Sequence, residues 1–332
     1  MASTSPTDIA SGHWSDFWRH GSLTTFFAGK YQHGYDGPVA EFWADVFDSL
    51  PLSATLVDLA TGNGAIPYLA AQAADRRQAQ WRIIGVDYAD IQVPTDPAVR
   101  AQMSQVELLP NTRMEQTGLD GDSVDLVTSH FGFEYGDIEQ VVAEVDRLLK
   151  PAGTLALVMH HPDSAVVRQA KRDYQQTRMC LDQERLDRKV TRLVKLVGHA
   201  RTPYQRDQLR HNPDAEKLRH QINRSMERLL QKVRGQEDDS QMFRVAQSFL
   251  RVFADLIDRP LEEKLDFIRQ SSASLSAYAG RMESMARATM SQDQFDQFLG
   301  LLEGIGLKCE QSGLLQTADG ELIGRSLVAF RP

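Results

Sequence analysis

The chain has 332 residues, which is long for one ordinary domain and short for two large ones, so a core domain with an insertion is the natural expectation. The formal net charge of −8 argues against a general nucleic-acid binder, and two cysteines are too few for a disulfide framework or a cysteine-rich metal site. The first residues lack the features of a signal peptide, and no apolar run reaches membrane-spanning length, so we expect a cytoplasmic protein.

The N-terminal segment is rich in aromatic residues. Ten of the chain's 26 aromatic residues fall between Trp14 and Phe47. So many aromatic side chains in a short segment must pack on something or close over something. Two interpretations stay open for residues 1–37: a helical pair that packs on the core, or a lid over a ligand pocket, for which Tyr31 is a candidate substrate contact. Residues 39–49 then predict a helix that leads into the first strand.

A glycine-rich turn follows the first predicted strand. The strand is a short apolar run with Asp58 at its tip, and the chain then turns through residues 61–64 into a segment with helical apolar spacing. Strand, glycine turn and helix open a nucleotide-binding α/β unit, because glycine lets a ligand approach the backbone and the helix N-terminus carries partial positive charge. A dinucleotide site would need a third glycine three residues after Gly64, where Pro67 stands instead.

The pattern Asp58-x-Ala60-x-Gly62-x-Gly64 resembles a known cofactor motif. It is similar to the first motif, D/E-x-G-x-G-x-G, of the class I S-adenosylmethionine-dependent methyltransferases, with alanine for the first glycine. The resemblance implies an α/β, Rossmann-like fold with a doubly wound, mostly parallel sheet of seven strands. It also implies that these four residues contact the cofactor S-adenosyl-L-methionine, whose amino-acid end carries a positive charge that suits Asp58.

The second predicted strand, residues 81–87, also ends in an acid. A carboxylate at the position of Asp87 can accept hydrogen bonds from both ribose hydroxyls of a nucleotide cofactor. Tyr88 follows directly and can pack on the sugar or the adenine. We therefore predict both residues as cofactor contacts.

The adenine end of the predicted site is less clear from the sequence. Residues 92–104 favour a helix, and residues 106–109 favour a third strand. The resembled family usually has an acid a few residues after this strand, which holds the adenine amino group. Arg113 stands at that position here, and Met114 is the candidate for an apolar contact to the ring.

The fourth strand is predicted at residues 124–129 and the fifth, with the turn before it, at 151–159, with a helix over 138–149 between them. Ligands in such folds bind beyond the carboxyl ends of the parallel strands, so cofactor and acceptor should meet at these tips. His130, at the end of the fourth strand, is accordingly predicted to contact the cofactor.

Several titratable residues at these tips are candidates for chemistry. Methyl transfer is an in-line displacement in which the protein mainly aligns acceptor, methyl group and sulfur, and a general base helps when the acceptor is a hydroxyl or protonated amine. We predict Glu134 and His160 as catalytic groups, and Tyr135 and His161 as acceptor contacts, although each could instead be structural. The two adjacent histidines lack a well-spaced carboxylate partner, so no metal site is expected.

The strand pattern disappears after residue 163 and returns near the C-terminus. Helical apolar spacing recurs over 186–197, 218–233 and 243–256, and Ser291 to Gln294 predicts a capping box for another helix. Strands resume at 307–315 and 326–330, which resemble the closing hairpin of the methyltransferase fold. The predicted core is therefore 38–162 with 290–332, and a helical insertion, 163–289, follows the fifth strand as a cap or a dimer interface.

The predicted insertion is basic. Between Val166 and Arg234 there are 18 lysines and arginines against eight acidic residues. Solvated helix faces often have such an excess, but it could also bind an anionic acceptor or RNA. The predicted function is O- or N-methylation of a small-molecule acceptor by an S-adenosylmethionine-dependent enzyme. The alternatives are an RNA methyltransferase that uses the basic helices, and a non-catalytic cofactor-binding scaffold whose long helices form a dimer interface. With any of these functions the protein could form a homodimer.

Overall fold

The computed structural model describes residues 6–25, 35–200, 202–209, 211–235 and 240–332. The chain divides into two compact units. The sheet unit consists of Met1–Arg168 and Ser284–Pro332, and the helical unit of Gln169–Glu283. The insertion predicted from the sequence, 163–289, contains the whole helical unit. None of the described helices is both long and apolar enough to cross a membrane.

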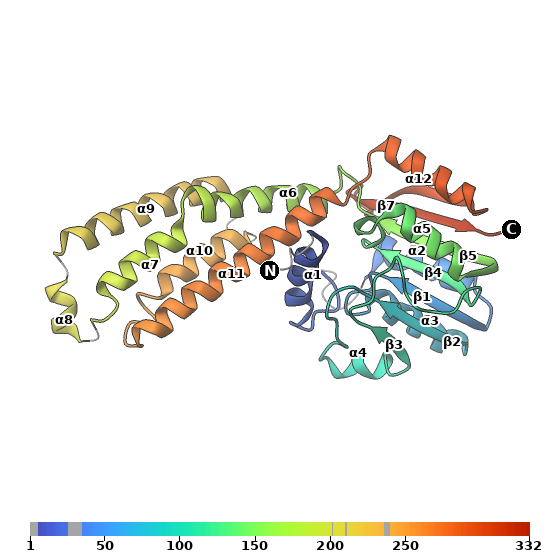
Figure 1. Cartoon of the computed structure of the whole chain (residues 1–332), viewed down its shortest axis with the longest axis horizontal. Coiled ribbons are helices and arrows are strands. Elements are labelled where there is room, and N and C mark those ends of the chain that lie inside the picture. The colour runs from blue at the N-terminus through green and yellow to red at the C-terminus, as the bar shows by residue number, and fades with distance from the viewer. Residues whose placement is uncertain (1–5, 26–34, 201, 210, 236–239) are drawn as a thin grey trace. The chain divides into compact units, whose positions relative to one another are not determined.

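The sheet unit is built on seven strands in the order β3-β2-β1-β4-β5-β7-β6 (Figure 1). The strands are β1 (Ser53–Leu59), β2 (Gln80–Val86), β3 (Val106–Leu109), β4 (Val124–His130), β5 (Leu149–Met159), β6 (Lys308–Gln316) and β7 (Leu322–Phe330). The first five pair in parallel, and β7 runs antiparallel to both β5 and β6. The strand order reverses between β1 and β4, where a crevice forms beyond the carboxyl ends of the strands. The predicted doubly wound, mostly parallel sheet is confirmed.

Helices cover both faces of this sheet (Figure 1). The helices of the sheet unit are α1 (Pro6–Trp18), α2 (Gly37–Asp48), α3 (Ala65–Arg77), α4 (Pro97–Gln102), α5 (Ile138–Leu148), α12 (Gln292–Gly304) and the short 3₁₀ turn η1 (Phe133–Tyr135). Apolar side chains of α5 and α12 form one core with the sheet, and those of α2 and α3 form another on the opposite face. Alternate residues of each buried strand face one core or the other, so both faces of the strand are buried and its sequence is a continuous apolar run.

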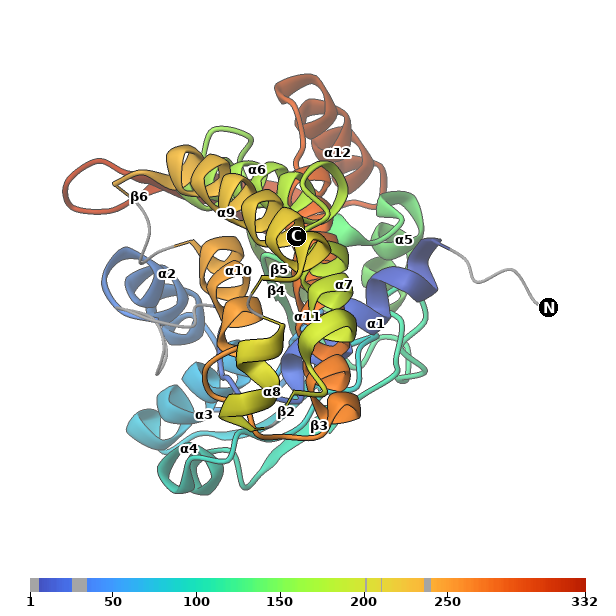
Figure 2. The ribbon, with the colours of Figure 1, turned by 90° about the vertical axis from the view of Figure 1, so that its left-hand side faces the viewer.

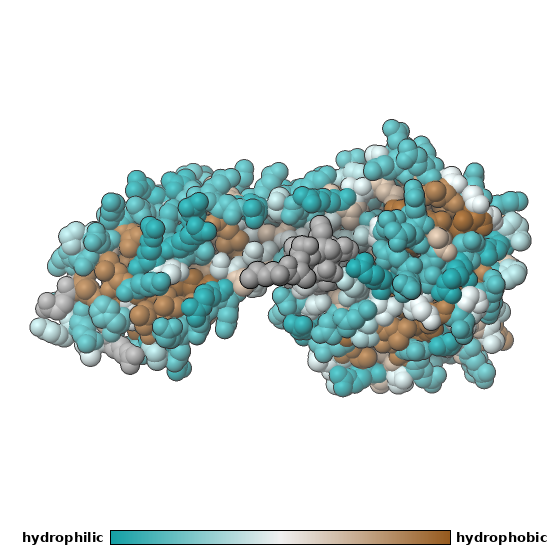
Figure 3. All heavy atoms as spheres, viewed as in Figure 1, coloured by the Kyte–Doolittle hydropathy of each residue, from teal (hydrophilic) through white to brown (hydrophobic). Residues whose placement is uncertain are grey.

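The helical unit is a bundle with its own core. Its elements are α6 (Ala165–Arg178, on which the boundary with the sheet unit falls), a π turn (Met179–Gln183), α7 (Leu186–Val197), α8 (Pro203–Gln208), α9 (Pro213–Val233), α10 (Gln241–Arg251) and α11 (Leu261–Arg287, on which the second boundary falls). Helices α7, α9 and α10 lie side by side and share an apolar core (Figure 2). Apolar side chains also reach the surface of this unit over α7 and α10 (Figure 3).

Local signals predicted some elements well and missed others. Asp137 caps α5 by accepting a hydrogen bond from the backbone of Gln140, and Ser291 and Gln294 form the predicted capping box of α12. Helix α10 ends at Arg251, although helical apolar spacing continues to Leu256. The predicted end was wrong because the spacing of apolar residues indicates a buried face and not the backbone hydrogen bonds that define a helix. Helices α6, α8 and α11 were not predicted.

Candidate active site

A cavity opens at the carboxyl ends of β1, β2 and β4, where the strand order reverses. It contains about 1140 Å³ of empty space, its open mouth included. Its walls come from α1, from the glycine turn after β1, and from the segments that follow β2, β3 and β4. Eight of the residues predicted from the sequence line it: Asp58, Ala60, Gly62, Asp87, Tyr88, Met114, His130 and Tyr135. The crevice predicted from topology is therefore a real cavity lined by the predicted turn.

The turn after β1 holds three residues in the left-handed region of backbone conformation. The φ angles are +53° at Ala60, +55° at Gly62 and +90° at Gly64. A Cβ atom on Gly62 would lie 2.4 Å from a ring carbon of Trp18, so only glycine fits there. Gly64 is the N-cap residue of α3 and is not among the cavity-lining residues. Alanine at position 60 carries a left-handed strain of about 1–2 kcal/mol, which a glycine would not.

Asp58 is a buried carboxyl that faces the cavity. Its side chain accepts a 2.7 Å hydrogen bond from Thr128 Oγ1 on β4, and its residue is 4% exposed. Burial raises the pKa of Asp58 to about 7, because the charged form has lost its hydration. Among the described residues no cation forms an ion pair with it. Such a carboxylate fits a ligand with a positively charged group.

Asp87 joins the glycine turn to the end of β2. One carboxyl oxygen accepts a hydrogen bond from the backbone N–H of Gly62 and the other from that of Ala89, both at 2.7 Å. Burial raises the pKa of Asp87 to about 6. A carboxylate has about four acceptor positions and the backbone uses two of them. The remaining lone pairs fit the two ribose hydroxyls of a nucleoside.

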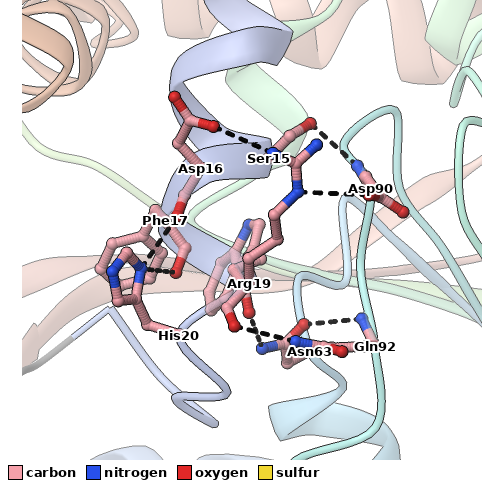
Figure 4. A network of polar contacts seen from close by, with 9 residues as sticks. Ser15, Asp16, Phe17, Arg19, His20, Asn63, Asp90 and Gln92 are labelled. Carbon is pink, nitrogen blue, oxygen red and sulfur yellow. Dashed lines mark hydrogen bonds and ion pairs between the residues drawn. The ribbon is translucent and has the colours of Figure 1, made fainter. Parts of the chain in front are cut away.

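Asn63, which the sequence analysis did not single out, ties the N-terminal segment to the glycine turn (Figure 4). The residue is completely buried. Its amide nitrogen donates to the carbonyl oxygens of Trp18 and Ser22, both at 2.9 Å, and its oxygen accepts from the backbone N–H of Gln92 at 3.0 Å. Gln92 Nε2 also donates to the carbonyl of Arg19. The sequence could have indicated this role, because the side chain of an asparagine between two glycines can form hydrogen bonds with several backbone groups at once.

The described aromatic residues of the N-terminal segment reach the cavity. Trp14 and Trp18 of α1 line it, as does Tyr35 before α2. The ring of Trp14 lies edge-on to that of Tyr135, with 5.9 Å between centroids. The segment thus contributes to the wall, and its role as a lid stays a prediction. Tyr31 lies outside the described residues.

His130 is held among aromatic residues. Trp43 Nε1 donates a 3.3 Å hydrogen bond to its Nδ1, and the rings of Tyr35 and Phe131 each lie 4.4 Å from its ring centroid. Burial, with a smaller effect of His160, lowers the pKa of His130 to about 3, so the imidazole is neutral. Its Nε2 is buried and has no hydrogen-bond partner among the described residues.

Glu134 and His160, the predicted catalytic pair, do meet. Glu134 Oε1 accepts hydrogen bonds from His160 Nδ1 at 2.6 Å and from the His160 backbone at 2.7 Å. Both side chains are almost completely buried, and neither belongs to the cavity-lining residues described. The ring of His160 instead stacks on that of Phe131, with 4.5 Å between centroids. His161 is also outside the lining, where its Nδ1 accepts from the backbone of Asp163. A catalytic role for the pair stays a prediction.

The segment after β3 contributes a cationic and an acidic side chain to the cavity wall. The guanidinium of Arg113 lies 4.4 Å above the ring of Tyr88 and donates to its hydroxyl at 3.1 Å. Glu115, two residues further on, also lines the cavity and accepts a hydrogen bond from the backbone of Asp137. It was missed because the acid expected from the resemblance was placed at position 113.

The sheet order, the glycine turn and the acids that end β1 and β2 define a nucleotide-cofactor-binding α/β fold of the methyltransferase kind. Residues 57–157 match a family model described as a methyltransferase domain. The chain therefore contains a class I S-adenosylmethionine-dependent methyltransferase domain, whose cofactor is S-adenosyl-L-methionine. No curated protein sequence matches the chain.

Several solved structures are similar to the chain. One is 1,6-didemethyltoxoflavin-N1-methyltransferase of Burkholderia thailandensis, with 9% identity over 100% of this chain and 92% of that chain, and a TM-score of 0.46. Another is geranyl diphosphate C-methyltransferase of Streptomyces coelicolor A3(2), with 17% identity over 45% and 64% of the two chains and a TM-score of 0.34. Phosphoethanolamine N-methyltransferase 1 of Haemonchus contortus has 16% identity over 49% and 34%, and a TM-score of 0.37. The matched part thus spans less than two thirds of the last two proteins.

Proposed function

We propose that the protein transfers the methyl group of S-adenosyl-L-methionine to an oxygen or nitrogen of a small-molecule acceptor bound in this cavity. The observation that carries the proposal is the composition of the walls. Trp14, Trp18, Tyr35 and Tyr135 supply apolar surface around a few polar groups, the usual make-up of a small-molecule site.

The charges of the cavity favour a small molecule over RNA. Its lining includes three carboxyl groups, those of Asp58, Asp87 and Glu115, against one guanidinium, that of Arg113. A site that binds a phosphate backbone needs several cationic side chains, and this lining supplies one. In the helical unit some of the basic excess is paired internally, since Arg228 and Lys189 both form ion pairs with Glu184. The RNA alternative therefore has less support.

The residues of the cavity fit the cofactor and would prepare it for reaction. The cofactor, when bound, supplies a methyl group on a positively charged sulfur. Asp58 would hold its ammonium group and Asp87 its ribose. Burial and the nearby Glu134 raise the pKa of Tyr135 well above its usual value of 10.0, so this phenol stays protonated and acts as a hydrogen-bond donor. Its hydroxyl is buried without a partner among the described residues, which suits an acceptor contact.

The test is to incubate the protein with methyl-labelled S-adenosyl-L-methionine and a host-cell extract, and to separate small molecules, RNA and protein. We expect the label in the small-molecule fraction. Label in RNA would overturn the choice of acceptor class. Cofactor binding without any transfer, in extracts from several growth conditions, would favour the scaffold alternative.

A further inference from the structure

We propose that His130 binds the carboxylate of the methionine part of the cofactor, through a hydrogen bond donated by its Nε2. This inference rests on the proposed function for the identity of the ligand. It names the atom that would bind the ligand and the protonation state of its ring, and it makes the tips of β1 and β4 a binding site for a zwitterionic amino-acid group.

The contact with Trp43 determines which nitrogen of His130 carries the proton. An indole N–H can only donate a hydrogen bond, and Trp43 Nε1 lies 3.3 Å from His130 Nδ1. Nδ1 must therefore be the unprotonated nitrogen of the neutral ring, and Nε2 carries the hydrogen. A second proton on Nδ1 would bring two N–H groups face to face, so Trp43 also opposes formation of the imidazolium.

The described protein offers this donor no acceptor, so the hydrogen bond is left for a ligand. Nε2 is buried without a hydrogen-bond partner among the described residues, while His130 is part of the cavity wall. An unsatisfied buried donor costs about 1–3 kcal/mol, which a ligand with an acceptor atom would relieve. The rings of Tyr35 and Phe131 hold the imidazole in place, so little side-chain entropy is lost when a ligand binds.

The register of the sheet places His130 beside the group that would hold the ammonium. Asp58 pairs with Thr128 across β1 and β4, and their side chains are hydrogen-bonded. His130 is two residues further along β4, on the same face and about 6.6 Å away along the strand. The ammonium and carboxylate of an amino acid are separated by a single carbon atom. With one hydrogen bond at each end they can bridge this span, so Asp58 and His130 would bind the two charges of one zwitterion.

The experiment compares two ligands that differ at the amino-acid end. S-adenosylhomocysteine has the ammonium and the carboxylate, whereas 5′-methylthioadenosine has the same adenosine and a thioether but neither charge. Isothermal titration calorimetry measures both affinities for the full-length wild type, for His130→Phe, which keeps a flat ring without the N–H, and for His130→Gln, which keeps an N–H near the position of Nε2.

We expect His130→Phe to bind S-adenosylhomocysteine about 10- to 100-fold more weakly, as for loss of a hydrogen bond to a charged group, and 5′-methylthioadenosine within about twofold of the wild type. His130→Gln should recover most of the difference. Equal losses for the two ligands, or unchanged binding of S-adenosylhomocysteine, would overturn the inference. If His130→Phe does not fold, judged by circular dichroism, His130→Leu takes its place in the comparison. A wild type that binds neither ligand would refute the proposed function itself.

Discussion

The substitution Asn63→Asp tests how the N-terminal segment is held against the glycine turn. The two side chains have the same shape, but the carboxylate lacks the N–H groups that now donate to the carbonyls of Trp18 and Ser22. Each carbonyl left without a donor costs about 1–3 kcal/mol, so we expect a loss of about 2–6 kcal/mol in the free energy of unfolding. That is a large part of the about 5–15 kcal/mol that stabilises a typical domain.

Fluorescence can report this loss for the sheet unit alone. The chain's four tryptophans are at positions 14, 18, 43 and 81, all within that unit. Denaturant titration followed by tryptophan emission should give a lower midpoint for Asn63→Asp. The defect should grow as the pH rises from about 4 to 8, because a buried aspartate has a raised folded-state pKa and the folded form then binds the extra proton.

The matched control is Asn111→Asp, the same chemical change at an exposed side chain with φ of +55°, a conformation that aspartate also tolerates. It should change the free energy of unfolding by less than about 0.5 kcal/mol. An Asn63→Asp variant that unfolds within the same margin of the wild type at pH 8 would refute the role assigned to this hydrogen-bond network.

Four further predictions test the site and the helical unit. Ala60→Gly should stabilise the protein by about 0.5–1 kcal/mol in denaturant titration, since it removes left-handed strain larger than the added chain entropy; a net loss would show that Ala60 is unstrained. Because the pKa of Asp58 is raised to about 7, the ligand-free protein should lose stability as the pH rises from about 4 to 7. Asp58→Asn should flatten this dependence of stability on pH and weaken S-adenosylhomocysteine binding at least tenfold; the same pH dependence in variant and wild type would contradict the assignment. The hydrogen bonds from Arg228 lower the pKa of Glu184 to about 2, so the helical circular dichroism melt should shift down as the pH falls from about 4.5 to 2, and Glu184→Gln should abolish that shift. Because His160 lies outside the cavity lining, we expect His160→Asn to lower kcat less than tenfold and to leave the pH dependence of kcat unchanged. A fall in kcat of about 10²–10⁴-fold, with loss of the acidic limb of its pH profile, would instead establish general-base catalysis.

The sequence by itself determined the parts of the site that lie on one short segment. Asp58, Gly62 and Asp87 could be assigned because a strand tip and its turn are local structures, and their spacing is read directly from the chain. The doubly wound order could also be predicted, since short apolar strands that alternate with amphipathic helices have few other ways to bury both faces.

What only the tertiary structure decided is which distant side chains meet. Spacing placed Glu134 and His160 at neighbouring strand tips, but it could not show that they pair with each other, outside the cavity lining, beneath the ring of Phe131. Likewise, the protonation state of His130 depends on Trp43, 87 positions away in the sequence. Hydrogen-bond partners and burial arise from packing between segments, and no local pattern encodes them.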